Sequence, residues 1–237
     1  NTTKYTIGLL HLDRFSVPFL FAALLGLIVL FVVAKWLKNT TRVHTFTTQK
    51  ASLRFTFTKY FVVLLGLSFV IQFVVTLFET VFSIYGKDEL GFNSNQIGIG
   101  FMLCGSIMAV LQPLFATYGE KFLSTKKQIA LGLFISGLSL IVFPFFKNEY
   151  LVYVLIVVFA AGGAMVTPNL LSAVSLISKQ NTGRNISIQS STNSVGQILG
   201  PVLGTWLLAG GFYYPFIIAG SIVLAVIGFL FFFKNPP

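Results

Sequence analysis

The chain has 237 residues, of which 55% are hydrophobic and only 9% are charged, and its mean hydropathy is +0.87. These values lie far outside the range of a soluble globular domain and predict a polytopic membrane protein. The formal net charge of +10 falls in the connections between apolar runs, where membrane topology and anionic lipid explain it, so we expect a lipid bilayer and no nucleic acid as partner.

Seven apolar runs are each long enough to cross a hydrocarbon core, for which about 20 residues suffice. They extend over residues 17–36, 60–85, 96–117, 129–146, 151–177, 187–208 and 213–233. The runs lack period-2 alternation, and a chain inside a bilayer must satisfy every backbone amide internally. The expected fold class is therefore an all-α polytopic membrane bundle.

The connection after the first run is basic and rich in Thr. It contains no acidic residue, and its basic residues are Lys35, Lys38, Arg42, Lys50, Arg54 and Lys59. By the positive-inside rule this connection is cytoplasmic, which predicts an amino end outside and a carboxyl end inside. Because many transporters are built from repeats of three or six helices, we interpret residues 1–36 as the last helix of a mostly absent amino-terminal bundle, 37–59 as a linker, and 60–237 as a six-helix bundle.

The second run contains Glu79, the one acidic residue inside an apolar segment. A charged residue at mid-membrane costs roughly 2.5–3.5 kcal/mol on insertion scales, so such acids usually face a bundle interior or a water-filled path. Glu79 belongs to a polar series at helical spacing, formed by Ser68, Gln72, Thr76, Glu79 and Ser83. One helix face would carry all five. We expect this stripe to line a cavity, with Gln72 and Thr76 as polar contacts for a substrate.

Three further side chains are candidate contacts in the middle runs. Phe82 of the second run offers a stacking surface, Gln112 of the third precedes Pro113, and Asn169 of the fifth follows Pro168. Proline-interrupted helices at corresponding places point to a midplane binding site, which also makes Pro168 a candidate conformational residue. The alternative for the small residues and prolines in these runs is ordinary helix packing.

The sixth run has a polar half followed by a glycine-rich half. Ser190, Asn193 and Gln197 lie on one face of a helix, and that face continues into the glycine-rich segment. We predict Asn193 and Gln197 as cavity-lining contacts, and interhelical hydrogen bonding is the alternative. The glycine-rich half is expected to pack tightly on a neighbouring helix and consists of Gly196, Gly200, Pro201 and Gly204.

No catalytic constellation is visible in the sequence. Cys104 is the only cysteine, and no run brings together the His, Cys or paired carboxylates that a metal or nucleophile site requires. We therefore expect neither an enzyme, a metal site nor an organic cofactor.

Three segments carry a resemblance to a known family. They are LFETVFSIY around Glu79, YGEKFLSTKK with Glu120 and Lys121, and the GxxxGPxxG of the sixth run. With them the chain resembles the part of major facilitator superfamily transporters that extends from the sixth to the twelfth helix, and within that family the proton-coupled bacterial multidrug exporters. The likeness implies a bacterial plasma-membrane antiporter that is driven by a proton gradient, with the missing amino-terminal half as its partner.

The resemblance also implies roles for these residues. Glu79 would handle protons or cationic drugs, while Glu120, Lys121 and the glycine-rich segment would serve conformational change. Some relatives carry an acid and an arginine before the proline of the tenth helix, whereas this chain has Ala164-Met165-Val166-Thr167 before Pro168. A second intramembrane charge is therefore not expected at that place.

The concrete hypothesis is alternating access, in which a lipophilic or cationic drug leaves in exchange for an entering proton. Burial disfavours the charged form of Glu79, which would let it hold a proton in one state and release it in a wetter one. A major-facilitator carrier for a neutral metabolite is the alternative. Spans two to seven hold no Arg or Lys for a charged solute, which favours apolar or cationic cargo and is also compatible with a neutral solute. A seven-helix receptor is the remote alternative, because the last span has no lysine for a retinal Schiff base.

Overall fold

The structure is a computed structural model that describes residues 5–7, 10–12, 16–36, 58–177 and 181–232. It divides into two compact units, Asn1–Phe55 and Thr56–Pro237, and each is described by itself. The predicted linker, residues 37–59, lies outside the described residues apart from Thr58 and Lys59.

The first unit consists of a short hairpin and one long helix. Strands β1 (Tyr5–Ile7) and β2 (Leu10–Leu12) pair antiparallel with Thr6 opposite His11, and helix α1 (Ser16–Trp36) follows. The helix confirms the first predicted run to within one residue. The hairpin was not predicted, because two strands of three residues give no readable alternation.

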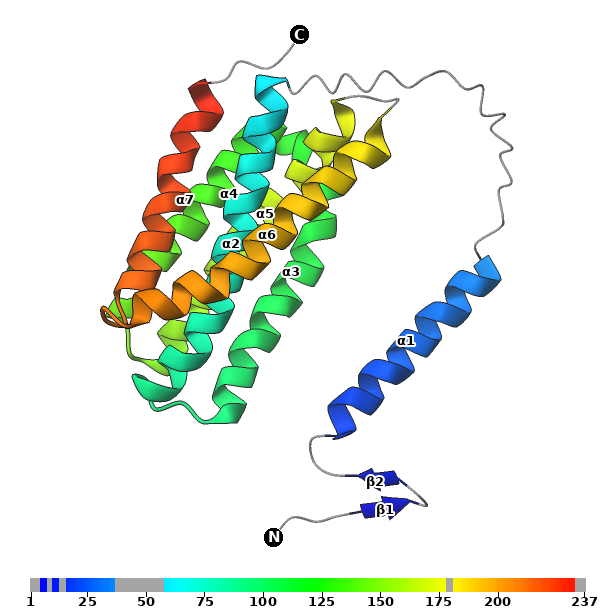
Figure 1. The fold of residues 1–237 in the computed structure, drawn as a ribbon, viewed down its shortest axis with the longest axis vertical. Coiled ribbons are helices and arrows are strands. Elements are labelled where there is room, and N and C mark those ends of the chain that lie inside the picture. The colour runs from blue at the N-terminus through cyan, green and yellow to red at the C-terminus, as the bar shows by residue number, and fades with distance from the viewer. Residues whose placement is uncertain (1–4, 8–9, 13–15, 37–57, 178–180, 233–237) are drawn as a thin grey trace. The chain divides into compact units, whose positions relative to one another are not determined.

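Over its described residues the second unit is a bundle of six helices, which we call the bundle (Figure 1). They are α2 (Lys59–Asp88), α3 (Ser94–Phe122), α4 (Thr125–Val142), α5 (Glu149–Leu176), α6 (Thr182–Leu208) and α7 (Tyr214–Phe232), with the 3-10 turn η1 (Phe143–Phe145) after α4. Each overlaps one predicted run, and the bundle has the predicted all-α membrane fold. By length and composition α1 to α5 are able to span a membrane, and α7 has a shorter apolar stretch, Tyr214–Leu230.

The helices begin where polar side chains satisfy their first amides. Asn93 closes a capping box with Gln96 at the start of α3, and Asn148 accepts hydrogen bonds from Tyr150 and Leu151 at the start of α5. Gly91 adopts a φ of +67° between α2 and α3, a left-handed conformation that glycine takes without strain. These local signals place the helix boundaries at the ends of the apolar runs.

Helices α2 and α5 each pack on four other helices of the bundle. Helix α2 packs most extensively on α6 and also on α3, α5 and α7, while α5 packs on α4, α3, α6 and α2, and α4 also packs on α7. Aromatic rings fill the core around α2, with Phe78 4.6 Å from Phe159, Phe143 4.9 Å from Phe216 and Tyr85 5.2 Å from Phe216 between ring centroids. Offset and edge-on ring pairs of this kind stabilise a core beyond the area they bury.

The prolines do not interrupt their helices. The structure corrects the prediction of a break at Thr167-Pro168-Asn169, since α5 continues through Pro168, and α3 and α6 likewise continue through Pro113 and Pro201. Membrane helices tolerate proline because neighbouring helices and hydroxyl side chains satisfy freed backbone groups. The hydroxyl of Thr167, next to Pro168, donates to the Gly163 carbonyl at 3.1 Å, whereas the carbonyl that Pro168 leaves without its helical donor is that of Ala164.

Candidate functional site

Glu79 lies in the middle of α2 on the side that the bundle leaves open. Its neighbours Phe78 and Val81 are buried in the core, whereas Glu79 itself is exposed. The carboxylate is within electrostatic range of the thiol of Cys104 on α3. It has no ion-pair partner among the described residues. The structure therefore presents an acid at mid-helix on an open face of the bundle, without a neutralising cation from its own bundle.

The other members of the polar stripe on α2 have separate environments. Ser68 is buried and accepts a hydrogen bond from the Gln189 amide of α6 at 2.9 Å. The Thr76 hydroxyl donates to the Gln72 carbonyl at 2.9 Å, and the Ser83 hydroxyl donates to the Glu79 carbonyl at 3.0 Å. The end of the stripe at Ser68 is thus part of the contact between α2 and α6, whereas Gln72, Thr76 and Glu79 are half-buried or exposed.

Helix α6 presses its glycines against this helix. An added Cβ would lie 3.4 Å from the Gln72 Cβ at Gly196, 2.6 Å from the Phe73 carbonyl oxygen at Gly200, and 3.0 Å from the Leu77 Cγ at Gly204. Small residues permit such close approach of membrane helices. Because Gly196 sits at the level of Gln72, its neighbours Asn193 and Gln197 lie beside the polar part of α2.

The polar face of α6 extends further towards the start of the helix than the sequence predicted. Gln197 and Ser190 are exposed, while Asn193 is half-buried and its Oδ1 has no hydrogen-bond partner. Asn185 and Gln189 lie two turns and one turn before Asn193, are each only 5% exposed, and were missed. Their spacing of four residues, through 185, 189 and 193, is the signal that identifies this face.

Three predicted contacts lie elsewhere. Phe82 is fully buried, with its ring 5.6 Å from that of Phe101. The Asn169 amide is buried and donates to the Gln128 Oε1 at 3.0 Å and to the Met165 carbonyl at 2.7 Å. Gln112 is half-buried on α3. The structure places Gln72 and Thr76 at the α2–α6 contact, where the Thr76 Oγ1 lies 3.5 Å from the Gly196 carbonyl oxygen. Glu79 lies further along α2, near Cys104 of α3, and Phe82 and Asn169 are engaged in packing.

The two predicted conformational residues of the loop motif lie where α3 meets α4. The Thr125 hydroxyl donates to the Glu120 Oε1 at 2.9 Å, which ties the first turn of α4 to the last turn of α3. The Lys121 ammonium lies 5.1 Å from the centre of the Tyr118 ring, a distance at which a cation and an aromatic face attract. Pro168 is half-buried within α5.

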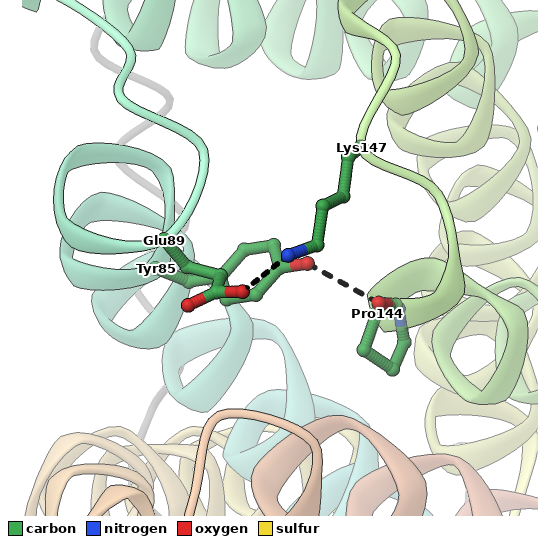
Figure 2. Close-up of polar contacts among 4 residues, drawn as sticks. All are labelled: Tyr85, Glu89, Pro144 and Lys147. Atoms are coloured by element: carbon green, nitrogen blue, oxygen red, sulfur yellow. Dashed lines mark hydrogen bonds and ion pairs between the residues drawn. The ribbon is translucent and has the colours of Figure 1, made fainter.

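The opposite end of the bundle carries an ion pair, which Figure 2 shows. The Lys147 ammonium contacts the Glu89 carboxylate at 2.6 Å, and the Tyr85 hydroxyl donates to the Pro144 carbonyl at 3.3 Å. The hydrogen bond and the charge of Glu89 raise the pKa of Lys147 above its ordinary value. Together the two contacts tie the end of α2 to the connection between α4 and α5.

A second polar tie joins α3 to α5 at the same end. The Gln96 amide donates to the Glu149 Oε2 at 2.8 Å, and the Tyr153 hydroxyl lies 2.9 Å from the Glu149 Oε1 and 3.1 Å from the Gln96 carbonyl. Over the part of the chain that the structure describes, no group of three His, Cys, Asp or Glu side chains converges as a metal site would require.

Comparisons with known proteins agree with this architecture. Residues 64–237 match the family described as the Major Facilitator Superfamily. The chain is 27% identical over 168 residues to Multidrug resistance protein 2 of Bacillus subtilis (strain 168), covering 70% of this chain and 42% of that relative. It is 29% identical over 195 residues to Tetracycline resistance protein, class B, of Escherichia coli, covering 78% of this chain and 48% of that relative.

A third relative is Quinolone resistance protein NorA of Staphylococcus aureus (strain COL). It is 26% identical over 167 residues, which cover 70% of this chain and 43% of the relative. The chain thus spans less than half the length of the curated relatives it matches.

Proposed function

Because this chain belongs to the Major Facilitator Superfamily, and so to transporters rather than enzymes, we propose that it is the carboxyl-terminal half of a proton-coupled exporter of lipophilic or cationic drugs. The proposal is supported by three relatives, which are named as multidrug, tetracycline and quinolone resistance proteins. The family assignment excludes the seven-helix receptor as an interpretation of the topology.

One observation carries the proposal, which is the placement of Glu79. A carboxylate at mid-membrane is costly unless it meets water, a partner charge or a proton. Glu79 is exposed on the open face and has no cationic partner among the described residues. In the complete transporter an amino-terminal bundle would close over this face, so the environment of Glu79 would alternate between wet and dry.

The mechanism follows from that alternation. When the central cavity is dry, the neutral carboxylic acid is favoured because burial penalises the charged form. When the cavity opens to water, the proton is released and the carboxylate attracts a cation. Gln72 and Thr76 precede Glu79 on α2, Asn193 and Gln197 lie on α6, which packs on α2, and all four would supply neutral polar contacts to a bound drug. The proton gradient supplies the free energy, and no cofactor is needed.

The orientation belongs to the same proposal. The turn between α3 and α4 holds Lys121, Lys126 and Lys127 with one acid, Glu120. This excess of positive charge favours the cytoplasmic side for that turn. The end with the Glu89–Lys147 pair would then face outward in a bacterial plasma membrane.

The test uses the full-length transporter in energised inverted vesicles with a fluorescent lipophilic cation. We expect wild-type protein to move the cation only while the proton gradient lasts, and Glu79→Gln to reduce transport to the level of de-energised vesicles. Asp88→Asn is the matched control, because Asp88 is an exposed acid at the end of the same helix, and it should transport normally.

Normal gradient-driven transport by Glu79→Gln would refute the role of this carboxylate. Wild-type protein that moves no lipophilic cation at all would refute drug export and favour the carrier for a neutral metabolite.

A further inference from the structure

A cavity of about 330 Å³ lies at the end of α3 beside α4 and α5. Its walls are apolar and include Leu114, Phe115, Phe122 and Met165. This volume is at the lower end of the range for small-molecule sites, about 300–1,000 Å³. The cavity is separate from Glu79, which does not line it.

The polar group at the cavity wall is already satisfied. Gln128 lines the cavity and is 1% exposed. Its Nε2 donates to the Leu123 carbonyl at 2.8 Å, and its Oε1 accepts from Asn169 at 3.0 Å. With its amide engaged at both ends, Gln128 has little to offer a polar ligand. The part of a ligand that enters must therefore be apolar.

The cavity is lined by exposed aromatic rings, and the positively charged α3–α4 turn beside it, residues 118–127, forms what we call its rim. Tyr118 and Phe122 line it and are 50% and 83% exposed. Lys121 lies over the Tyr118 ring, and Lys127 is exposed next to Gln128. Between Tyr118 and Gln128 three lysines stand against one acid, a formal sum of +2, and that acid accepts a hydrogen bond from Thr125. A rim of this sign attracts an anion and repels the lipophilic cation proposed as cargo.

We propose that this cavity binds an acyl chain of an anionic phospholipid, whose headgroup phosphate pairs with Lys121 and Lys127. Aromatic side chains mark the membrane interface, and basic pockets between helices on the cytoplasmic side suit anionic headgroups. The apolar wall takes the chain and the lysine rim takes the phosphate, which matches the two parts of such a lipid. The choice of the cytoplasmic leaflet rests on the orientation proposed above, whereas binding itself does not depend on the cargo.

The experiment measures tryptophan quenching by brominated lipids in nanodiscs that hold the full-length transporter. Phe122→Trp places the reporter on the cavity wall, and its signal is the difference from the parent protein. Brominated phosphatidylglycerol is compared with brominated phosphatidylcholine at each position. Phe134→Trp is the matched control, since Phe134 is a 51%-exposed aromatic residue on α4 that does not line the cavity.

We expect brominated phosphatidylglycerol to quench the reporter at position 122 at a mole fraction about fivefold or more lower than brominated phosphatidylcholine requires. Attraction of a phosphate by at least one nearby lysine has an effect of this size. That preference should vanish in Lys121→Gln/Lys127→Gln, and the control position should show no preference. Because both leaflets of a nanodisc carry the same lipid, the result is independent of orientation and of drug transport.

Three results would overturn the proposal. Equal quenching by the two lipids at position 122 would indicate unselective annular lipid. Absence of quenching there, with normal quenching at position 134, would show that protein covers the cavity. A preference that survives the double lysine variant would assign it to other residues. If Phe122→Trp does not fold, Leu114→Trp on the same wall provides the same readout.

Discussion

The contact between α2 and α6 leaves no room for a methyl group at Gly200. An added Cβ would collide with the Thr76 Oγ1 and would lie 2.6 Å from the Phe73 carbonyl oxygen and 2.9 Å from the Leu77 amide nitrogen. Two of these three atoms belong to the backbone of α2 and cannot rotate away. Gly200→Ala should therefore force the two helices apart, and overpacking of this kind typically costs about 1–3 kcal/mol.

The steric cost of the methyl group at Gly200 is measured against the same substitution at a matched glycine, Gly98. Alanine stabilises a helix interior by about 1 kcal/mol relative to glycine, and this gain partly hides the steric cost. Gly98→Ala in α3 receives the same gain without a clash, because no atom lies within 4 Å of its added Cβ. The difference between the two variants isolates the steric cost. For a cooperative unit of the size of this chain, about 1–3 kcal/mol corresponds to a Tm lower by roughly 2–12 °C, and the shift is smaller in the longer full-length transporter because the entropy of unfolding grows with chain length.

The assay is thermal unfolding of the purified full-length transporter, with Gly98→Ala and Gly200→Ala measured side by side. Adding Thr76→Ala to Gly200→Ala should restore little, since the Phe73 carbonyl still blocks the methyl group. Equal Tm values for the two alanine variants would refute the reasoning. Full rescue by Thr76→Ala would show that the hydroxyl alone was in the way.

Two further predictions concern the polar ties at the opposite end of the bundle. Tyr153→Phe removes the hydroxyl that links α5 to α3 and should lower the free energy of unfolding by about 0.5–1.5 kcal/mol. The control Tyr150→Phe changes a side chain that is 79% exposed and should alter this free energy little. Equal losses for the two variants in denaturant titrations would contradict this prediction. Lys147 has a folded-state pKa raised above its ordinary 10.5 by Glu89, so its contribution is fully present below pH 10.5 and is lost as pH rises through the higher folded value. Unfolding curves of wild type and Lys147→Gln should thus differ at pH 8 and converge in strong alkali, and a gap that persists there would show that the charge is not its source.

The sequence predicted the helices well because each apolar run is long and its ends are marked. The run at 60–85 corresponds to α2 at Lys59–Asp88, and that at 151–177 corresponds to α5 at Glu149–Leu176. The hydrocarbon thickness sets the length of every run, so composition alone is informative. The proline at position 168 was over-interpreted, since a membrane helix continues through proline when its neighbours support it.

Side-chain partners across helices were beyond the reach of the sequence. Gln128 and Asn169 form a hydrogen bond although 41 positions separate them in the sequence, and Ser68 and Gln189 do so across 121 positions. Each pairing depends on the rotation and register of two helices, which hydropathy does not encode. Asn169 was predicted as a substrate contact for its place after a proline, yet its amide is engaged with Gln128 and Met165. The packing role of the glycine-rich half of α6 was easier to predict, because close packing is the usual reason for glycine at helical spacing.

The contacts of α2 limit how a proton on Glu79 can act. The glycines of α6 hold α2 from one side, the aromatic core with Phe143 and Phe216 holds it from another, and the Glu89–Lys147 pair fixes its end. A packed core of this kind shifts between discrete arrangements and does not deform continuously. A change of charge at Glu79 is therefore poorly placed to move α2 within the bundle. Under the proposed function we expect it to act instead at the open face, where it would change the affinity of this bundle, as one body, for the amino-terminal bundle that closes over it.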